Sequence, residues 1–261
     1  MSWTERLAIL SDEAALDFAE AVSICLPLGI RAYELRSLPG GRIPYVSPEA
    51  IETVIAKQQR HGLTLIGVSP GFCKGKADEP AANIELRQGF DAAFRLLDRL
   101  GVRRMTVFSY QRSERDAPVP AYVLDLLAQA AERCRTQGVD MLIENASSCW
   151  ADTGANLAAI ARHIGVRVTW DAANAQASGE HAYPDGYAHV RDLIAHVHCK
   201  NWLPGKGWVA ISDGLVNMRG QIKVLLTDEY KGYFCVEPHQ WHNRANATRL
   251  NTYQILQLLK E

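Results

Sequence analysis

The feature that most constrains the fold of this chain is a regular alternation of strand-like and helical segments, repeating roughly every 30 residues, the span of a strand–helix unit. The expected strands contain β-branched or aromatic residues and tend to end in Gly, Pro, Asn or Ser. They cover residues 6–11, 32–37, 64–69, 104–110, 140–145, 167–171, 195–200 and 232–237. Amphipathic helical patterns cover residues 12–26, 48–61, 81–100, 119–137, 154–164, 187–193, 218–227 and 244–259. Eight strand–helix pairs in succession predict an α/β chain with a parallel sheet.

Helix start and stop signals agree with this division. Ser47 precedes Pro48, which suits an N-cap followed by proline at the first helical position. Glycine follows several helical segments, as at Gly62 and Gly101, where a left-handed residue ends a helix. In 261 residues, this pattern is best matched by a single-domain (β/α)8 TIM barrel over residues 1–261. An open doubly wound sheet is the alternative, but the first strand is not followed by a glycine-rich turn.

The charge balance narrows the choice of partner. The chain has 28 Lys and Arg against 29 Asp and Glu, so a basic surface for nucleic acid is not indicated. No apolar run approaches the roughly 20 residues of a membrane span, and the first residues do not have the pattern of a signal peptide. The six cysteines are widely spaced without a C-x-x-C pair, which is typical of reduced, buried thiols. We therefore expect a cytoplasmic protein that acts on a small molecule, with neither nucleic acid nor membrane as partner.

Polar residues end four successive expected strands. They are Glu144, Asp171, His198 and Glu237. Side chains alternate along a strand, so an apolar residue such as Trp170 can face the helices while Asp171 faces the barrel axis. In a (β/α)8 barrel the catalytic residues lie at the carboxyl ends of the strands. We therefore expect the four side chains to meet at one rim of the barrel.

Three carboxylates and one imidazole in a cleft predict a divalent metal site. The carboxylates would repel one another strongly without a cation. The donor set suits Mn²⁺, Co²⁺, Mg²⁺ or Zn²⁺, and we favour Mn²⁺ or Co²⁺. A single acid at a strand end is more often a helix cap or an ion-pair partner, and a single strand histidine is more often a core residue. Four such positions on four successive strands are much harder to explain in that way.

Several short segments, in this order, resemble one family over essentially the whole chain. They are Tyr33-Glu34-Leu35-Arg36, Ile143-Glu144-Asn145, Asp171-Ala172-Ala173-Asn174, His198-Cys199-Lys200-Asn201, Ser212-Asp213-Gly214 and Gly232-Tyr233 leading to Glu237. The sequence thus resembles the xylose isomerase-like TIM barrels, or sugar phosphate isomerase/epimerase superfamily. The resemblance implies that Glu144, Asp171, His198 and Glu237 bind the metal and that Glu144 and Glu237 are also the catalytic acid/base pair. It also implies a homo-oligomer of unspecified size.

The implied reaction is isomerisation or epimerisation of a monosaccharide, keto-sugar or related polyol ketone. A metal that holds the carbonyl and neighbouring hydroxyl oxygens acidifies the C–H between them and stabilises the enediolate. One carboxylate removes the proton, and its return to the opposite face or to the adjacent carbon gives epimer or isomer. The substrate-binding residues we expect are Glu34, Arg36, Asn174, Lys200 and His239, although Glu34 and Arg36 could instead pair with each other.

Three positions depart from the family pattern. Asn174 replaces a frequent histidine, Asn201 replaces a frequent acid, and Asn217 stands where a further acid often follows the loop glycine. None of them is an implied metal ligand, but Asn174 bears on the choice of substrate.

These departures leave other functions open. A dehydratase or lyase, of the inosose or 3-dehydroshikimate type, would use the same proton abstraction. A sugar-binding barrel without activity is a further alternative. A DNA repair endonuclease is disfavoured, because it would require additional metal ligands and a basic groove.

Overall fold

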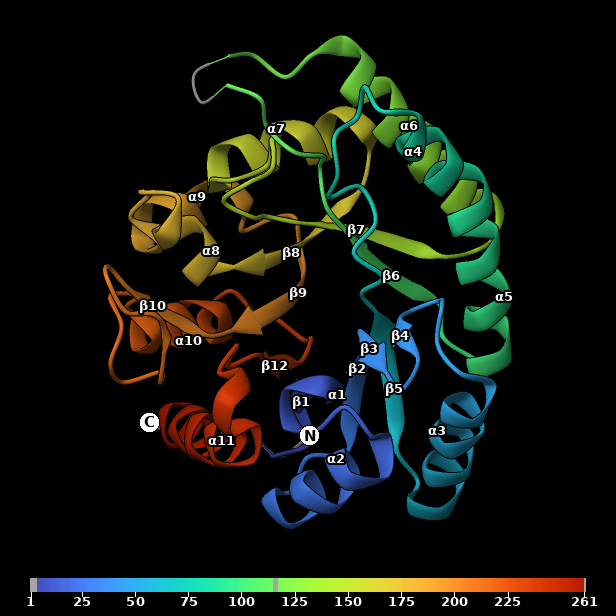
Figure 1. Cartoon of the computed structure of the whole chain (residues 1–261). Helices are drawn as coiled ribbons and strands as arrows, with labels where there is room; N and C mark the ends of the chain where they lie inside the picture. The colour runs from blue at the N-terminus through green and yellow to red at the C-terminus, as the bar shows by residue number, and fades with distance from the viewer. Residues whose placement is uncertain (1–3, 115–116, 261) are drawn as a thin grey trace.

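The computed structural model describes residues 4–114 and 117–260, and its centre is a closed barrel of eight parallel strands (Figure 1). Going round the barrel, the strand order is β1-β12-β9-β8-β7-β6-β5-β2. The strands are β1 (Leu7–Leu10), β2 (Ala32–Leu35), β5 (Thr64–Val68), β6 (Arg104–Val107), β7 (Asp140–Glu144), β8 (Arg167–Asp171), β9 (Ile194–Cys199) and β12 (Phe234–Val236). The predicted single-domain (β/α)8 TIM barrel is therefore confirmed, with every expected strand in its place.

Helices surround the barrel, as Figure 1 shows. They are α1 (Ser11–Ala14), α2 (Phe18–Cys25), α3 (Pro48–His61), α4 (Pro80–Ile84), α5 (Phe90–Leu100), α6 (Ala121–Thr136), α7 (Gly154–Ile164), α8 (Ala172–Ala177), α9 (Tyr187–Val190), α10 (Met218–Thr227) and α11 (Arg244–Lys260). The helix expected at residues 12–26 is divided, because Ala15 is extended and Asp17 caps α2 by accepting a hydrogen bond from Glu20. The helix expected at residues 81–100 contains a π-helical turn, Glu85–Gly89.

Local signals account for the helix ends. The Ser47 hydroxyl accepts a hydrogen bond from the Ala50 amide at the start of α3, and Gly62 ends that helix with φ of 60°. Thr153 caps α7 through the Asn156 amide. A side-chain oxygen at the N-cap satisfies one of the amides that the first turn leaves without a partner.

The strands place alternate side chains on two different layers. Ile143, Trp170 and Phe234 pack in the main core between strands and helices, and the Trp170 indole donates to Gln221 on α10. The barrel interior holds a small cluster of Ala8, Leu10, Ala32 and Cys235. This is the alternation that turns Asp171 and Glu237 toward the barrel axis. All six cysteines are free and buried, as expected.

Two hairpins extend the carboxyl ends of strands and were not predicted. One joins β3 (Ser37–Leu38) to β4 (Gly41–Arg42) directly after β2. The other joins β10 (Asn201–Leu203) to β11 (Gly207–Val209) after β9. Strands of two or three residues carry too little periodicity to be recognised in a sequence. None of the helices in the described ranges is both long and apolar enough to cross a bilayer.

Gly154 provides a test of the packing at the start of α7. A Cβ atom at this position would lie 2.2 Å from the carbonyl oxygen of Gly186, so the backbone of one segment would have to move. We predict that Gly154→Ala lowers the free energy of unfolding by about 1–3 kcal/mol, the usual cost of overpacking. Gly75→Ala is the matched control, because a Cβ there would meet nothing within 4 Å. Equal unfolding midpoints for the two variants in urea would contradict this account.

Candidate metal centre and cavity

Glu144, Asp171, His198 and Glu237 form one buried cluster at the carboxyl ends of their strands. One donor atom from each lies within 4.8 Å of the others. Glu144 and Asp171 are the last residues of β7 and β8, His198 lies on β9, and Glu237 follows β12. The structure thus brings together the four side chains that the sequence placed at one rim.

His198 presents one ring nitrogen to the cluster and the other to the barrel floor. Its Nδ1 lies 3.1 Å from Glu144 Oε1 and 3.3 Å from Glu237 Oε2, while its Nε2 lies 2.9 Å from Glu34 Oε2. Burial alone would lower the pKa of His198, but these three carboxylates raise it well above its usual value. Because Nε2 faces Glu34, Nδ1 is the ring nitrogen available to a cation held by Glu144 and Glu237.

The two oxygens of Asp171 have different partners. Oδ1 accepts hydrogen bonds from the amides of Ala173 and Asn174 and so caps α8. Oδ2 lies 2.6 Å from Lys200 Nζ. Burial raises the pKa of Asp171, and the Lys200 charge opposes that rise. Asp171 is thus both a helix cap and a member of the cluster, with Oδ2 free of the capping role.

Lys200 is a buried cation beside two of the acids. Its Nζ lies 2.9 Å from Glu237 Oε2 and 4.7 Å from the centre of the Trp208 ring. Burial alone would lower the pKa of Lys200, but Asp171 and Glu237 raise it. Burial likewise would raise the pKa of Glu237, whereas Lys200 and neighbouring histidines hold it well below its usual range. Both groups therefore stay charged at neutral pH.

Arg36 connects the cluster to α1, the short helix that follows the first strand. Its guanidinium contacts Asp12 Oδ2 at 3.0 Å, Glu13 Oε1 at 2.5 Å and Glu237 Oε1 at 2.7 Å. The sequence does not predict a role for Asp12 or Glu13, although both lie in α1, which begins directly after the carboxyl end of β1. Arg36 and Glu34 do not pair with each other. Arg36 lines the cavity described below, where we had expected a substrate contact.

Glu34 lies beneath the cluster instead of in the cavity. Its side chain is only 1% exposed, and its Oε2 lies 2.9 Å from both His196 Nε2 and His198 Nε2. The Ser69 hydroxyl also donates to Glu34. A carboxylate that is enclosed in this way holds the His198 ring in place. Where the sequence predicted a substrate contact, we therefore propose a positioning role for Glu34.

The two asparagine departures have different surroundings. Asn174 lines the cavity, and its Nδ2 donates to the Asn145 carbonyl at 2.8 Å and lies 3.4 Å from Glu144 Oε1. Asn201 is fully buried outside the cavity. Its amide donates to the carbonyls of Ile211 and Val216 and accepts from the amides of Trp202 and Val216. Asn201 thus holds the loop after β9 together, while Asn174 remains available to a ligand.

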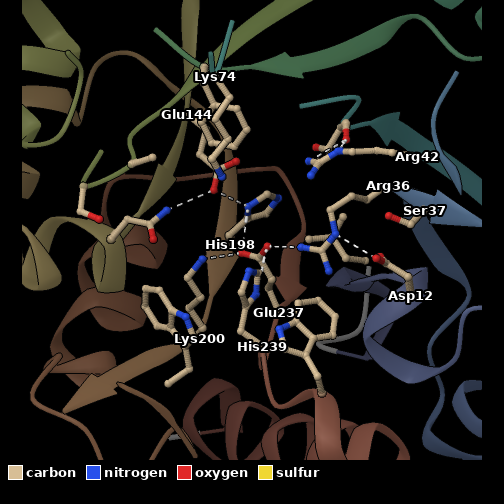
Figure 2. Close-up of a pocket in the computed structure, with 18 of the residues that line it drawn as sticks. Asp12, Arg36, Ser37, Arg42, Lys74, Glu144, His198, Lys200, Glu237 and His239 are labelled. Carbon is tan, nitrogen blue, oxygen red and sulfur yellow. Dashed lines mark hydrogen bonds and ion pairs between the residues drawn. The ribbon is translucent and has the colours of Figure 1, made fainter. Parts of the chain in front are cut away.

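A cavity of about 510 Å³ opens onto the cluster (Figure 2). Glu144, His198 and Glu237 lie at its base, and Lys200, Trp208 and His239 line one side. The His239 amide donates to Glu13 at 2.8 Å, and its Nδ1 lies 3.1 Å from Glu13 Oε1. This volume falls in the range of small-molecule sites.

The donor set fits a divalent cation. Three carboxylates and one imidazole nitrogen, buried and within reach of a common point, are ligands of Mn²⁺, Co²⁺, Mg²⁺ or Zn²⁺. Lys200 neutralises part of this negative charge. The other ring nitrogen of His198, Nε2, is hydrogen-bonded to the Glu34 carboxylate, as is usual for a histidine that binds a metal.

The fold and this cluster define a TIM barrel with a candidate metal-binding site at the carboxyl ends of its strands. A family model described as "Xylose isomerase-like TIM barrel" matches residues 22–254. The chain therefore belongs to the xylose isomerase-like TIM barrel family. No curated protein matches its sequence significantly.

Solved structures share the fold at low sequence identity. The probable 3-DHS dehydratase AsbF of Bacillus anthracis has a TM-score of 0.75 at 15% identity, over 96% of this chain and 98% of that chain. D-psicose 3-epimerase of Clostridium cellulolyticum H10 has a TM-score of 0.71 at 14% identity, over 97% and 99%. The IolI protein with a bound zinc atom has a TM-score of 0.79 at 13% identity, over 97% and 98%.

The position of Glu34 generates a prediction about metal affinity. We expect Glu34→Gln to weaken Mn²⁺ binding about 10- to 100-fold, because the amide holds and polarises His198 less well than a carboxylate does. Isothermal titration with Mn²⁺ measures this. Glu85→Gln is the control. Glu85 is a partly buried carboxylate outside the cluster, and it accepts a hydrogen bond from the Cys73 amide. Unchanged affinity in a folded Glu34→Gln protein would rule out the positioning role.

Proposed function

We propose that this protein is a divalent-metal-dependent isomerase or epimerase that acts on a keto-sugar, monosaccharide or related polyol ketone. The observation that carries the proposal is the convergence of Glu144 and Glu237 on one nitrogen of His198, at 3.1 and 3.3 Å. Two carboxylates from separate strands thereby flank one point at the base of the cavity. A substrate carbon near this point would have a proton acceptor on either side.

Glu144, Asp171, His198 and Glu237 would hold the metal. When bound, a divalent cation polarises substrate oxygens and so acidifies the C–H between a carbonyl and a hydroxyl. The choice of metal is part of the proposal, with Mn²⁺ or Co²⁺ favoured. The IolI protein, which shares this fold, binds a zinc atom, and this supports a metal-binding role without deciding which metal.

The two glutamates have unequal partners, which suggests unequal roles. Glu144 contacts the Asn174 amide and His198, and it has no Lys or Arg partner among the described residues. Glu237 contacts Arg36 and Lys200. We therefore assign removal of the substrate proton to Glu144. Glu237 is held ionised by Arg36 and Lys200, so it would return a proton on the other side only after Lys200, whose Nζ lies 2.9 Å from Glu237 Oε2, has passed one to it.

The cavity residues would orient the substrate. Lys200 is fixed with its ammonium group at the cavity wall and can donate to a substrate oxygen. Asn174 and His239 line the same cavity and offer an amide and an imidazole to hydroxyl groups. Trp208 supplies an apolar face for a sugar ring.

A dehydratase is the second candidate, and the unequal partners of the glutamates favour it. Elimination of water next to a carbonyl needs one base and one proton donor for the leaving hydroxyl. Glu144 and Lys200 would supply these, with no demand on the ion-paired Glu237. The likeness to a probable 3-DHS dehydratase supports this alternative at the level of the fold.

The assignment of Glu144 predicts the fate of one substrate proton. With ketoses, inososes and keto sugar acids in deuterated water, the Mn²⁺-loaded protein should exchange a C–H beside the carbonyl of its substrate. Glu144→Gln should slow exchange by about 10²–10⁴-fold, the usual contribution of a general base. Proton NMR follows the exchange, and the appearance of an enone product would identify the dehydratase instead.

The control for this experiment is Glu132→Gln, which removes an exposed carboxylate on α6. It should exchange at the wild-type rate. If Glu144→Gln exchanged an identified substrate as fast as wild type, Glu144 would not be the base. A protein that retains its metal but exchanges and converts nothing in the panel would favour the sugar-binding alternative.

A further inference from the structure

The cavity is lined by more Lys and Arg side chains than Asp and Glu side chains. Two of the lining cations, Arg36 and Lys200, are ion-paired with the buried acids of the cluster and of α1. Arg42, Lys74 and Arg244 also line the cavity, and within the described residues none of them forms an ion pair with a carboxylate. Although the whole chain has a net charge of −1, these three cations without carboxylate partners in the described residues lie around one cavity.

Arg42 is the most firmly placed of these cations. It lies on β4, in the hairpin that follows β2, and its Nε and Nη2 lie 3.4 and 3.2 Å from the Ser69 carbonyl oxygen. A guanidinium has five N–H groups, so contact with this one carbonyl leaves several for a ligand. Figure 2 shows Arg42 at the cavity, on the opposite side from Lys200 and His239.

The backbone around Arg42 is adapted to this position. Gly71 follows β5 with φ of +79°, and a Cβ atom there would lie 2.6 Å from both Cζ and Nε of Arg42. Any other residue at position 71 would push the guanidinium aside. Glycine at this point leaves room for the planar group to lie against the loop backbone, where it contacts the Ser69 carbonyl.

Lys74 lies in the same loop, three residues after Gly71. Its Nζ lies 4.2 Å from the centre of the Phe108 ring, and Phe108 also lines the cavity. In the view of Figure 2, Lys74 lies at the opposite end of the drawn cavity from Lys200 and His239. The β3–β4 hairpin and the loop after β5 thus each contribute one cation that has no acidic partner in the described structure.

We propose that Arg42 and Lys74 form an anion subsite, and hence that the substrate carries a carboxylate or phosphate group that reaches the part of the cavity wall these two residues line. The planar N–H groups of arginine match the oxygens of either anion. The inference that the bound anion belongs to a substrate rests on the proposed function. The anion subsite itself rests only on the cavity and its charges.

Three six-carbon ketoses test this subsite: D-fructose, 5-keto-D-gluconate and D-fructose 6-phosphate. They present a neutral, a carboxylate and a phosphate form of a similar skeleton. Isothermal titration at constant ionic strength measures the Kd of each for the Mn²⁺-loaded and the metal-free protein. We expect at least one anionic ligand to bind at least tenfold more tightly than D-fructose, and its identity distinguishes carboxylate from phosphate.

Arg42→Gln should weaken binding of that anionic ligand about 10- to 100-fold, the value of a charge-assisted hydrogen bond. It should change the Kd of D-fructose less than threefold. Lys74→Gln should have the same selectivity with a smaller effect. Arg60→Gln, which removes one positive charge from an exposed position on α3, is the control and should bind as wild type does.

Two results would overturn the subsite. One is that neither anionic ketose binds more tightly than D-fructose. The other is that Arg42→Gln weakens the neutral and anionic ligands equally, as a merely structural role in the hairpin would require. Anion binding that depends on Arg42, in a protein without proton exchange on any ketose, would support the subsite and contradict the proposed function. Exchange on neutral ketoses alone would do the reverse.

Discussion

The constraint on which the site depends is the burial of several carboxylates at one end of a parallel barrel. Glu34, Glu144, Asp171 and Glu237 are each less than 5% exposed. An isolated buried charge is very costly, so each must be paired or hydrogen-bonded. Arg36, Lys200 and His198 supply positive charge and donors, and the amides at the start of α8 hold Asp171. Among the described residues, Glu144 has only His198 as a cationic partner, whereas Glu237 also contacts Arg36 and Lys200, and this imbalance is the basis of the role proposed for Glu144.

The barrel could be predicted because two strong periodic signals agree along the whole chain. Alternation in the strands separates Ile143, Trp170 and Phe234, which pack on the helices, from the polar residues that face the axis. Helix caps such as Ser47 and Thr153 fix the helix starts. Parallel strands then bring Glu144, Asp171, His198 and Glu237 to one rim without further assumptions, since strand ends of a barrel share that rim.

The rest of the site depends on contacts that no local pattern contains. Strand alternation predicts only that Glu34 faces the inside of the barrel. Whether it then contacts a ligand or the His198 ring depends on its depth in the barrel, which the pattern does not contain. Asp12 and Glu13 follow β1 but act through Arg36, which lies more than 20 residues further along the chain. Arg42 reaches the cavity through a hairpin with two-residue strands, whose periodicity is too short to detect. The need for glycine at position 71 becomes clear only in the structure, where a Cβ atom would meet the Arg42 guanidinium.

We infer that the buried acids and His198 form a metal centre. The most direct test of this inference is the metal content of the purified protein, measured by inductively coupled plasma mass spectrometry after Mn²⁺ loading and removal of free ion. We expect about one divalent ion per chain, and its loss in a Glu144→Ala/His198→Ala variant that still shows the circular dichroism of a folded barrel. A wild-type protein that retains no ion, or a double variant that retains as much as wild type, would contradict the inference.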